Sequence, residues 1–295
     1  MSIITLFSAF MGLYVIVRLI LPSGMNWPLK LILSLFALAC AEKLLLTKLV
    51  YGTMGAFMPE PVQLASGYLH SAVTILFLLL VARDALLLLT WPFRRSTGRQ
   101  RKIFYGHKEK KPASGFWAFT LVLLALALSG YGMREALRVP PVREVRMQVP
   151  GLPDALNGFR IAQLSDLHIG PTFGKAWLTD VVARTDSLNP DLIVITGDVV
   201  DGSPSRLEED VAPLADLKAK YGVIFAPGNH EYYSGIQQWL PVFQRLGMHV
   251  LMNENTQIRV NGTPLAIAGG TDTAALNWGL EGPDPEKALP GLSKD

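Results

Sequence analysis

The sequence predicts a multi-span α-helical membrane region followed by an α/β domain, and two observations support this order. Apolar residues make up 50% of the chain, and their excess lies in roughly the first 135 residues, where long apolar stretches recur. After that, short β-like runs alternate with segments of helical periodicity. We therefore expect a transmembrane region at residues 1–135, a linker at residues 136–150 and a domain at residues 151–295.

The membrane region contains four apolar stretches, each near the ~20 residues that cross a bilayer. Trp27, Trp91 and Trp117 lie at their edges, where an indole prefers the membrane interface. A buried bundle of soluble helices is the alternative interpretation. The expected spans are residues 3–21, 29–46, 71–91 and 116–131.

The loop between the third and fourth expected spans, residues 92–115, is strongly basic and holds a single acid, Glu109. The positive-inside rule places this loop in the cytoplasm, and an even number of spans then places both termini and the domain outside. The loop could also bind anionic lipid headgroups, although a topology signal is the plainer interpretation. Four arginines after the last span favour the opposite placement: Arg134, Arg138, Arg143 and Arg146.

Two charged residues, Arg83 and Asp84, fall within the third expected span. Such a pair marks either a bond between helices or a path for a substrate or proton. Adjacent residues point about 100° apart on a helix, so we expect the two to contact different neighbours. No internal repeat or broken helix pair favours a transporter, and the structural role is the stronger reading.

The net charge and the cysteine count exclude several kinds of partner and site. The formal net charge of +3 is too small to indicate a nucleic-acid partner, and none is expected. Cys40 is the only cysteine, so neither an intrachain disulfide nor a cysteine-based metal site can form.

The second half begins with a Pro-rich, extended segment, residues 139–151, which we expect to lead into an edge strand. The alternation that follows predicts a largely parallel sheet covered by helices. Asn261-Gly262 is typical of a type I′ hairpin turn. Strands are expected at residues 159–165, 191–196, 222–226, 249–252, 256–260 and 264–268, and helices at residues 177–188, 205–220 and 236–246.

Three of these strands end in side chains that bind metals. Asp166 and His168 follow the first, and because they occupy alternate positions, an extended backbone points both to one side. Asp198 follows Gly197 after the second strand, and Asn229 follows the third. Ligands gather beyond the carboxyl ends of parallel strands, so one shared metal centre is expected there. A mixed oxygen and nitrogen set suits Mn, Fe, Zn, Co or Ni better than Ca²⁺.

His230 and Glu231 complete the third motif. His230 could donate a proton or hydrogen bond to a leaving group, whereas Glu231 is expected to orient a neighbour or cap the next helix. Each motif alone is more often an ordinary turn. Their order, their spacing and their common place at strand ends make the combination informative.

Three segments, residues 160–168, 196–201 and 227–231, resemble the opening motifs of the calcineurin-like metallophosphoesterases, most closely those of membrane-anchored bacterial members. The resemblance implies a two-sheet sandwich flanked by helices and hydrolysis of phosphomonoesters or phosphodiesters. It also implies two divalent metal ions, with Asp166 and His168 on one, Asn229 on the other and Asp198 bridging them. His230 would then assist the leaving group.

The chain departs from the family pattern after His230, because the three further metal-binding histidines have no counterpart. His249 matches neither remaining motif, and the sequence stops where the next core strand is expected, so the domain is expected to be incomplete here. The chain is then either a truncated piece of a complete enzyme or a shortened protein with weak or no activity.

Two hypotheses from different classes follow. The first is a membrane-bound phosphoesterase in the cell membrane that acts on a phosphoester, for which a lipid or cell-envelope compound is plausible. The second is a non-catalytic membrane protein with a residual metal-binding or phosphate-binding site. Transport through the spans rests on Arg83 and Asp84 alone and is the weakest interpretation.

Overall fold

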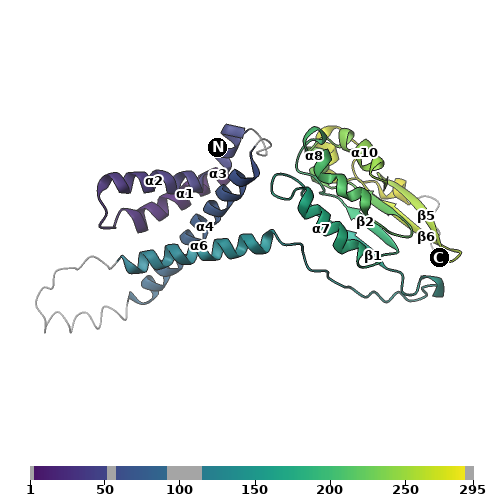
Figure 1. The fold of residues 1–295 in the computed structure, drawn as a ribbon, viewed down its shortest axis with the longest axis horizontal. Coiled ribbons are helices and arrows are strands. Elements are labelled where there is room, and N and C mark those ends of the chain that lie inside the picture. Colours follow the sequence, from purple (N-terminus) through teal and green to yellow (C-terminus); the bar gives the residue numbers. More distant parts are fainter. Residues whose placement is uncertain (1–2, 52–57, 92–114, 290–295) are drawn as a thin grey trace, which may run out of the picture. The chain divides into compact units, whose positions relative to one another are not determined.

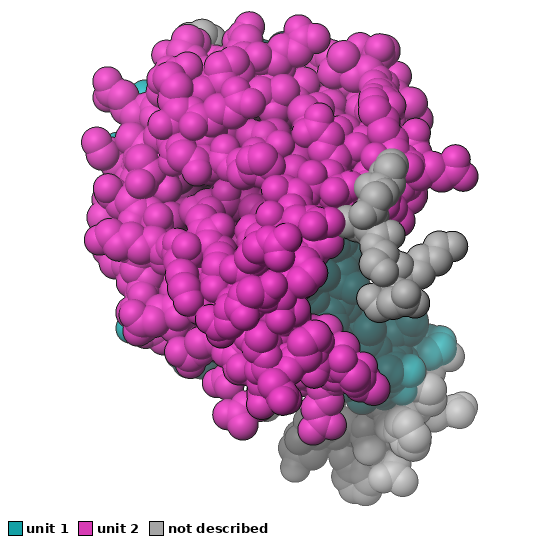
Figure 2. Space-filling model, turned by 90° about the vertical axis from the view of Figure 1, so that its right-hand side faces the viewer, with its two compact units in different colours: residues 1–138 teal, residues 139–295 magenta. Residues whose placement is uncertain are grey.

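The computed structural model describes residues 3–51, 58–91 and 115–289. The chain divides into two compact units, residues 1–138 and residues 139–295 (Figure 2). This division falls inside the segment for which a linker is expected. Residues 92–114, which make up the basic loop except for its last residue, lie outside the described residues. Residues 290–295 at the end of the chain do so as well.

Helices are the only regular secondary structure in the described residues of the first unit. Three of its helical stretches are long and apolar enough to cross a membrane by length and composition: residues 3–20, 60–89 and 116–136. The elements are α1 (Ile3–Val15), the π-helix η1 (Ile16–Ile20), α2 (Trp27–Ala41), α3 (Lys43–Tyr51), α4 (Glu60–Leu89) and α6 (Phe116–Ala136) (Figure 1).

The second expected span, residues 29–46, does not form one continuous helix. Asn26 caps the start of α2 by accepting a hydrogen bond from the Leu29 N–H at 3.1 Å, and α2 ends at Ala41 after 15 residues. Glu42 then adopts a ψ of 26° before α3 begins. The helix is thus interrupted where charged residues enter the apolar run. The four-span arrangement stays a prediction.

The core of the first unit joins α1, α4 and α6. Met11, Val15, Leu80 and Ala125 are among the buried side chains of this cluster. Phe77 packs edge-on against three aromatic rings of α1, including that of Tyr14 at a centroid distance of 5.3 Å. Apolar packing therefore fixes these three helices side by side.

One expectation about the charges of this unit is wrong. Arg83 does contact its neighbour Asp84, with its Nη1 atom 2.9 Å from the Asp84 Oδ1 atom. The Cα–Cβ bonds diverge on the helix, but the long arginine side chain bends back far enough to close the gap. Asp84 also bonds to Tyr14 of α1 and to Arg18 of η1, as expected for a contact between helices.

The second unit is an α/β domain with two sheets. The described residues 139–153 contain no strand, so the expected edge strand is absent there and β1 is the edge of the sheet instead. The strands are β1 (Ile161–Leu164), β2 (Leu192–Thr196), β3 (Val223–Ala226), β4 (Met248–Val250), β5 (Glu254–Val260) and β6 (Thr263–Gly269). The α-helices are α7 (Lys175–Asp186), α8 (Pro204–Val211), α9 (Asn229–Tyr233), α10 (Ile236–Arg245) and α11 (Pro285–Ala288), and the short 3₁₀ helices are η3 (Asp154–Leu156), η4 (Ala212–Asp216) and η5 (Thr273–Trp278).

The first four strands form a parallel sheet in the order β1-β2-β3-β4, and β5 and β6 form an antiparallel pair. Alternate residues of β2 enter different cores, because strand side chains alternate between faces. Ile193 and Ile195 pack with residues of α7, α8 and α10, whereas Leu192 and Val194 lie in a second cluster that includes Ile267 of β6. The parallel sheet is thus covered by helices on one face and by the hairpin on the other (Figure 1).

The local signals located these elements closely. The Asn261-Gly262 turn has two positive φ angles, 48° and 88°, which confirms the type I′ prediction. The helix expected at residues 205–220 is shorter, because Pro213 lacks an N–H and cannot continue an α-helix; α8 ends at Val211 and a 3₁₀ turn follows.

Candidate metal centre

The parallel register brings the carboxyl ends of three strands together. Leu164 pairs with Ile195, and Thr196 pairs with Ala226. The loops after β1 and β2 then remain joined by their backbones, since the His168 N–H donates to the Asp198 carbonyl at 3.0 Å and the Ile169 N–H donates to the Val199 carbonyl at 2.8 Å. Backbone hydrogen bonds alone therefore hold two of the predicted motifs side by side.

The backbone at these loops is left-handed rather than extended. Asp166, His168 and Asp198 have φ angles of 56°, 46° and 55°. Non-glycine residues rarely adopt this conformation, and such strain clusters at functional sites. The expectation that an extended chain points Asp166 and His168 to one side is wrong in its geometry, because β1 ends at Leu164. The two side chains nevertheless meet, with 3.9 Å between Asp166 Oδ1 and His168 Nε2.

Two glycines allow the second and third loops to touch. Gly197 has a φ of 79°, and a Cβ atom there would overlap the backbone of Gly228. A Cβ atom on Gly228 would in turn overlap the Asp198 side chain. The resulting contact lets the His230 N–H donate to Asp198 Oδ1 at 2.9 Å. Close backbone approach, which only glycine permits, thus brings the third motif to the second.

Glu231 is fully buried and joins the second and third loops through their backbone N–H groups. Its carboxylate accepts hydrogen bonds from the N–H groups of Asp198 at 2.9 Å, Val199 at 2.7 Å and Gly228 at 2.8 Å. Burial raises the pKa of Glu231, and the backbone donors partly offset that effect. Orienting a neighbour or capping the next helix is the predicted role, and the capping role is confirmed, because the Glu231 carboxylate accepts the N–H of Gly228, the N-cap residue of α9.

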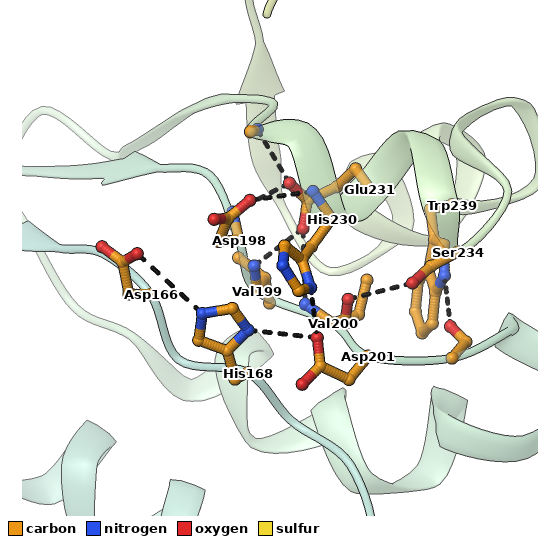
Figure 3. Close-up of polar contacts among 12 residues, drawn as sticks. Asp166, His168, Asp198, Val199, Val200, Asp201, His230, Glu231, Ser234 and Trp239 are labelled. Atoms are coloured by element: carbon orange, nitrogen blue, oxygen red, sulfur yellow. Dashed lines mark hydrogen bonds and ion pairs between the residues drawn. The ribbon is translucent and has the colours of Figure 1, made fainter. Parts of the chain in front are cut away.

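The side chains converge on one point at this edge of the sheet (Figure 3). His168, Asp198 and His230 each offer a ligand atom, and these atoms all lie within 4.8 Å of one another. Asp166 stands on the far side of His168 and is largely exposed. Asn229 begins α9 directly before His230 and is half-buried. Of the five residues that the sequence singled out, the structure thus brings the ligand atoms of His168, Asp198 and His230 together, with Asp166 beside His168 and Asn229 next to His230 in the chain.

Asp201 is the member of the site that motif reasoning gave no role. Its Oδ1 atom lies 3.0 Å from Nδ1 of His168 and 2.6 Å from Nδ1 of His230. The two rings meet edge to face at a centroid distance of 4.5 Å. One carboxylate therefore holds both imidazoles by the same ring nitrogen and leaves Nε2 of each for another partner. Its place at the end of the second motif was the available signal.

The electrostatics favour positive charge at the centre. Burial alone would lower the pKa of His168, but the hydrogen bond to Asp201 and the nearby carboxylates of Asp198 and Asp166 outweigh it, so the pKa is raised. A negative cluster that stabilises an imidazolium also attracts a cation. Two imidazoles and two carboxylates, with an orienting carboxylate behind the rings, fit a divalent transition metal.

Comparison with known proteins agrees with this geometry. The model of the calcineurin-like phosphoesterase family matches residues 159–287. A zebrafish (Danio rerio) protein named as a transmembrane protein with a metallophosphoesterase domain is 36% identical over 195 residues, 63% of this chain and 45% of its own length. A bovine (Bos taurus) protein of the same name is 37% identical over 183 residues, 59% of this chain and 41% of its own length.

A bacterial relative, an uncharacterised metallophosphoesterase of Campylobacter jejuni, is 32% identical over 166 residues, 56% of this chain and 42% of its own length. The chain thus spans less than half the length of each of these three relatives. No solved structure matches the chain significantly. Proteins of this family bind divalent metal ions. The chain thus carries a domain, residues 159–287, that is similar to the calcineurin-like phosphoesterases.

Proposed function

We propose that the protein is a membrane-bound, metal-dependent phosphoesterase that hydrolyses a phosphomonoester or phosphodiester by means of a metal-activated water. One observation carries the proposal: the ligand atoms of His168, Asp198 and His230 lie within 4.8 Å of one another, although three separate strand ends supply them. A chance cluster would not also place a shared carboxylate, Asp201, behind both imidazoles.

Asp166, His168, Asp198 and Asn229 are the proposed ligands of two divalent metal ions, drawn from Mn, Fe, Zn, Co and Ni. The left-handed backbone at the first three residues supports this role, because it keeps carboxylate and imidazole groups at the loop surface. Bound cations would supply positive charge to the phosphate and lower the pKa of an attacking water. The fixed loops hold the ligands in place beforehand, so little reorganisation is needed when substrate binds.

His230 is the proposed proton donor to the leaving oxygen. Its Nδ1 atom faces Asp201 at 2.6 Å, and this contact orients the ring with its Nε2 atom away from Asp201. The proton on Nε2 is then available to a leaving group above the site. His230 also lies close enough to be a ligand. The two roles are distinguished by whether its removal abolishes metal binding or only turnover.

The membrane placement comes from the first unit. Three helices of spanning length and relatives named as transmembrane proteins support membrane association. We propose a multi-pass protein of the cell membrane with the loop at residues 92–115 in the cytoplasm and the domain outside. A lipid or cell-envelope phosphoester is the proposed substrate, because an anchored site meets such compounds at the surface; membrane lipids are its surroundings, and no nucleic acid is expected.

The test is hydrolysis of p-nitrophenyl phosphate and bis(p-nitrophenyl) phosphate by the full chain in detergent, with Mn²⁺ or Zn²⁺ added. We expect metal-dependent release of nitrophenol that is lost with a chelator and in Asp198→Ala. Asp180→Ala is the matched control, since Asp180 is an exposed acid on α7. Equal turnover with and without metal, or undiminished turnover in Asp198→Ala, would reject the proposal.

A further inference from the structure

A second cluster of charged side chains belongs to the helical unit, which contains none of the three phosphoesterase motifs. Asp84 of α4 accepts hydrogen bonds from Tyr14 at 2.7 Å and from Nε of Arg18 at 2.5 Å, both on its Oδ2 atom. Its Oδ1 atom accepts from Arg83 at 2.9 Å. The Arg83 guanidinium also stacks over the Trp117 ring, 4.1 Å from its centroid. We call these five residues the Arg18–Arg83 cluster.

The charges of this cluster do not balance. Arg18 and Arg83 each carry a full positive charge, and Asp84 is the one acid that bonds to either of them within residues 3–51, 58–91 and 115–289. Both carboxylate oxygens of Asp84 are already engaged, whereas each guanidinium has five N–H donors. One positive charge and several donors remain for an anion.

Exposure shows which groups an anion can reach. The side chains of Arg18 and Arg83 are 43% and 34% exposed, while that of Asp84 is 17% exposed. The acid is thus the inner member, and the two guanidinium groups form the outer surface of the cluster. Planar guanidinium groups match the oxygens of a phosphate better than a point charge does.

All of these residues lie at one end of the helices that carry them. Arg18 is in the last turn of the stretch at residues 3–20, and Asp84 precedes the end of α4 at Leu89 by about 8 Å along the axis. Trp117 is the second residue of α6. In a spanning arrangement this end lies at the level of lipid headgroups, where indoles and arginines are commonly found.

The cluster is held in place from beneath. Val15, Leu80 and neighbouring buried side chains of α1, α4 and α6 pack against Tyr14 and Trp117. Arg18 also belongs to the π-helix η1, whose wider turn often marks a functional site in a helix. Because the core orients the guanidinium groups, binding an anion costs little side-chain entropy.

We propose that the Arg18–Arg83 cluster binds the phosphate of an anionic phospholipid headgroup. The proposal rests on the membrane placement given above and not on the phosphoesterase activity. It commits to a phosphate within the bilayer surface, because the proposed spanning arrangement puts the outer guanidinium groups at that depth and the helices around them expose apolar side chains such as Phe10, Leu13 and Val17.

Native mass spectrometry of the full chain, with phosphatidylglycerol or phosphatidylcholine as the probe, tests the proposal. We expect retention of phosphatidylglycerol over phosphatidylcholine, reduced at least about fivefold in Arg83→Gln and in Arg18→Gln. Arg138→Gln is the matched control, since Arg138 is an exposed arginine past the other end of α6 that pairs with Glu135. Equal retention of both lipids, or equal losses in Arg83→Gln and Arg138→Gln, would overturn the proposal.

Asp84→Asn separates a lipid site from a purely structural ion pair. Removal of the acid leaves both guanidinium groups without their internal partner, so a phosphate site binds phosphatidylglycerol at least as well as before. A structural lock instead loses folded protein and lipid together. Displacement of the lipid by inorganic phosphate would identify a soluble anion as the ligand and overturn the lipid assignment. The comparison of the two lipids on the unaltered chain stands even where a variant fails to fold.

Discussion

At the scale of single residues, Asp201 explains why two histidines lie together in a folded protein. Imidazoles 4.5 Å apart repel each other when both are protonated, and a carboxylate oxygen shared between their Nδ1 atoms offsets that repulsion. It also fixes the tautomer, because Nδ1 must donate and Nε2 is left to face the site. Asp201 therefore positions the rings of both His168 and His230.

Replacing this carboxylate by its amide tests that role. We expect Asp201→Asn to reduce metal affinity or turnover by about 10–100-fold, because the imidazoles lose a charged acceptor and their fixed tautomer. The measurement is kcat and KM as a function of Mn²⁺ concentration on the full chain. Asp180→Asn, an exposed acid on α7, controls for the loss of one negative charge. Identical metal titrations for the two variants would show that Asp201 has no positioning role.

Substitutions of the three histidines of the domain distinguish a metal ligand from a proton donor. His168→Ala should lose bound metal, whereas His230→Ala should keep it and lose about 10²–10⁴ in kcat, the usual contribution of general acid catalysis. His249→Ala changes an exposed histidine on β4 and should alter neither quantity. Metal content by atomic emission, beside kcat on a nitrophenyl ester, gives both readouts. Loss of metal in His230→Ala would make His230 a ligand instead.

At the scale of elements, the position of the site residues depends on the conformation of the loops beside the strands more than on the strands themselves. Gly197 and Gly222 both have positive φ angles, 79° and 84°, but their surroundings differ. A Cβ atom at Gly222 would meet nothing within 4 Å, whereas one at Gly197 would overlap Gly228. The pair therefore separates the cost of a strained backbone from the cost of parting two loops.

We expect Gly222→Ala to destabilise the domain by about 1–2 kcal/mol, the cost of a left-handed alanine. Gly197→Ala should cost roughly 3–5 kcal/mol, because overpacking adds to that strain, and should also abolish metal-dependent turnover by displacing Asp198. Thermal unfolding of the full chain, followed with the nitrophenyl ester assay, measures both. If Gly197→Ala retained the turnover of Gly222→Ala, close approach of the two loops would not be what assembles the site.

Local pattern was enough to locate most elements of the domain. Apolar runs and helical spacing gave β1, β2, β3 and α7 to within about two residues, because these signals depend on neighbours in sequence. The break at Glu42 escaped prediction, since an apolar run on both sides hides a change of one ψ angle. The partners of Asp201 escaped it too, because they lie 33 and 29 residues away and meet it only through the sheet register.

At the scale of the whole molecule, the number of spans determines the side of the membrane on which the amino terminus lies, but it has less effect on the side of the domain. Whether or not α2 and α3 cross the membrane, α6 is the one described helix of spanning length between the basic loop and the domain. In the proposed multi-pass arrangement, the side of the domain is therefore set by the loop at residues 92–115 and by the crossing of α6 alone. The amino terminus, in contrast, changes sides with each added span.

Cysteine labelling in intact cells tests this reasoning. In a Cys40→Ser background, which is free of cysteine, Ser96→Cys marks the basic loop and Glu209→Cys marks an exposed position on α8. We expect a membrane-impermeant maleimide to label Glu209→Cys in whole cells and to label Ser96→Cys only after the membrane is opened, because cytoplasmic loops retain lysine and arginine. The reverse pattern would place the domain in the cytoplasm and give the arginines after α6 the greater weight. Labelling of both positions in whole cells would mean that α6 does not cross the membrane, and the metal centre would then have to meet its substrate on the same side as the basic loop.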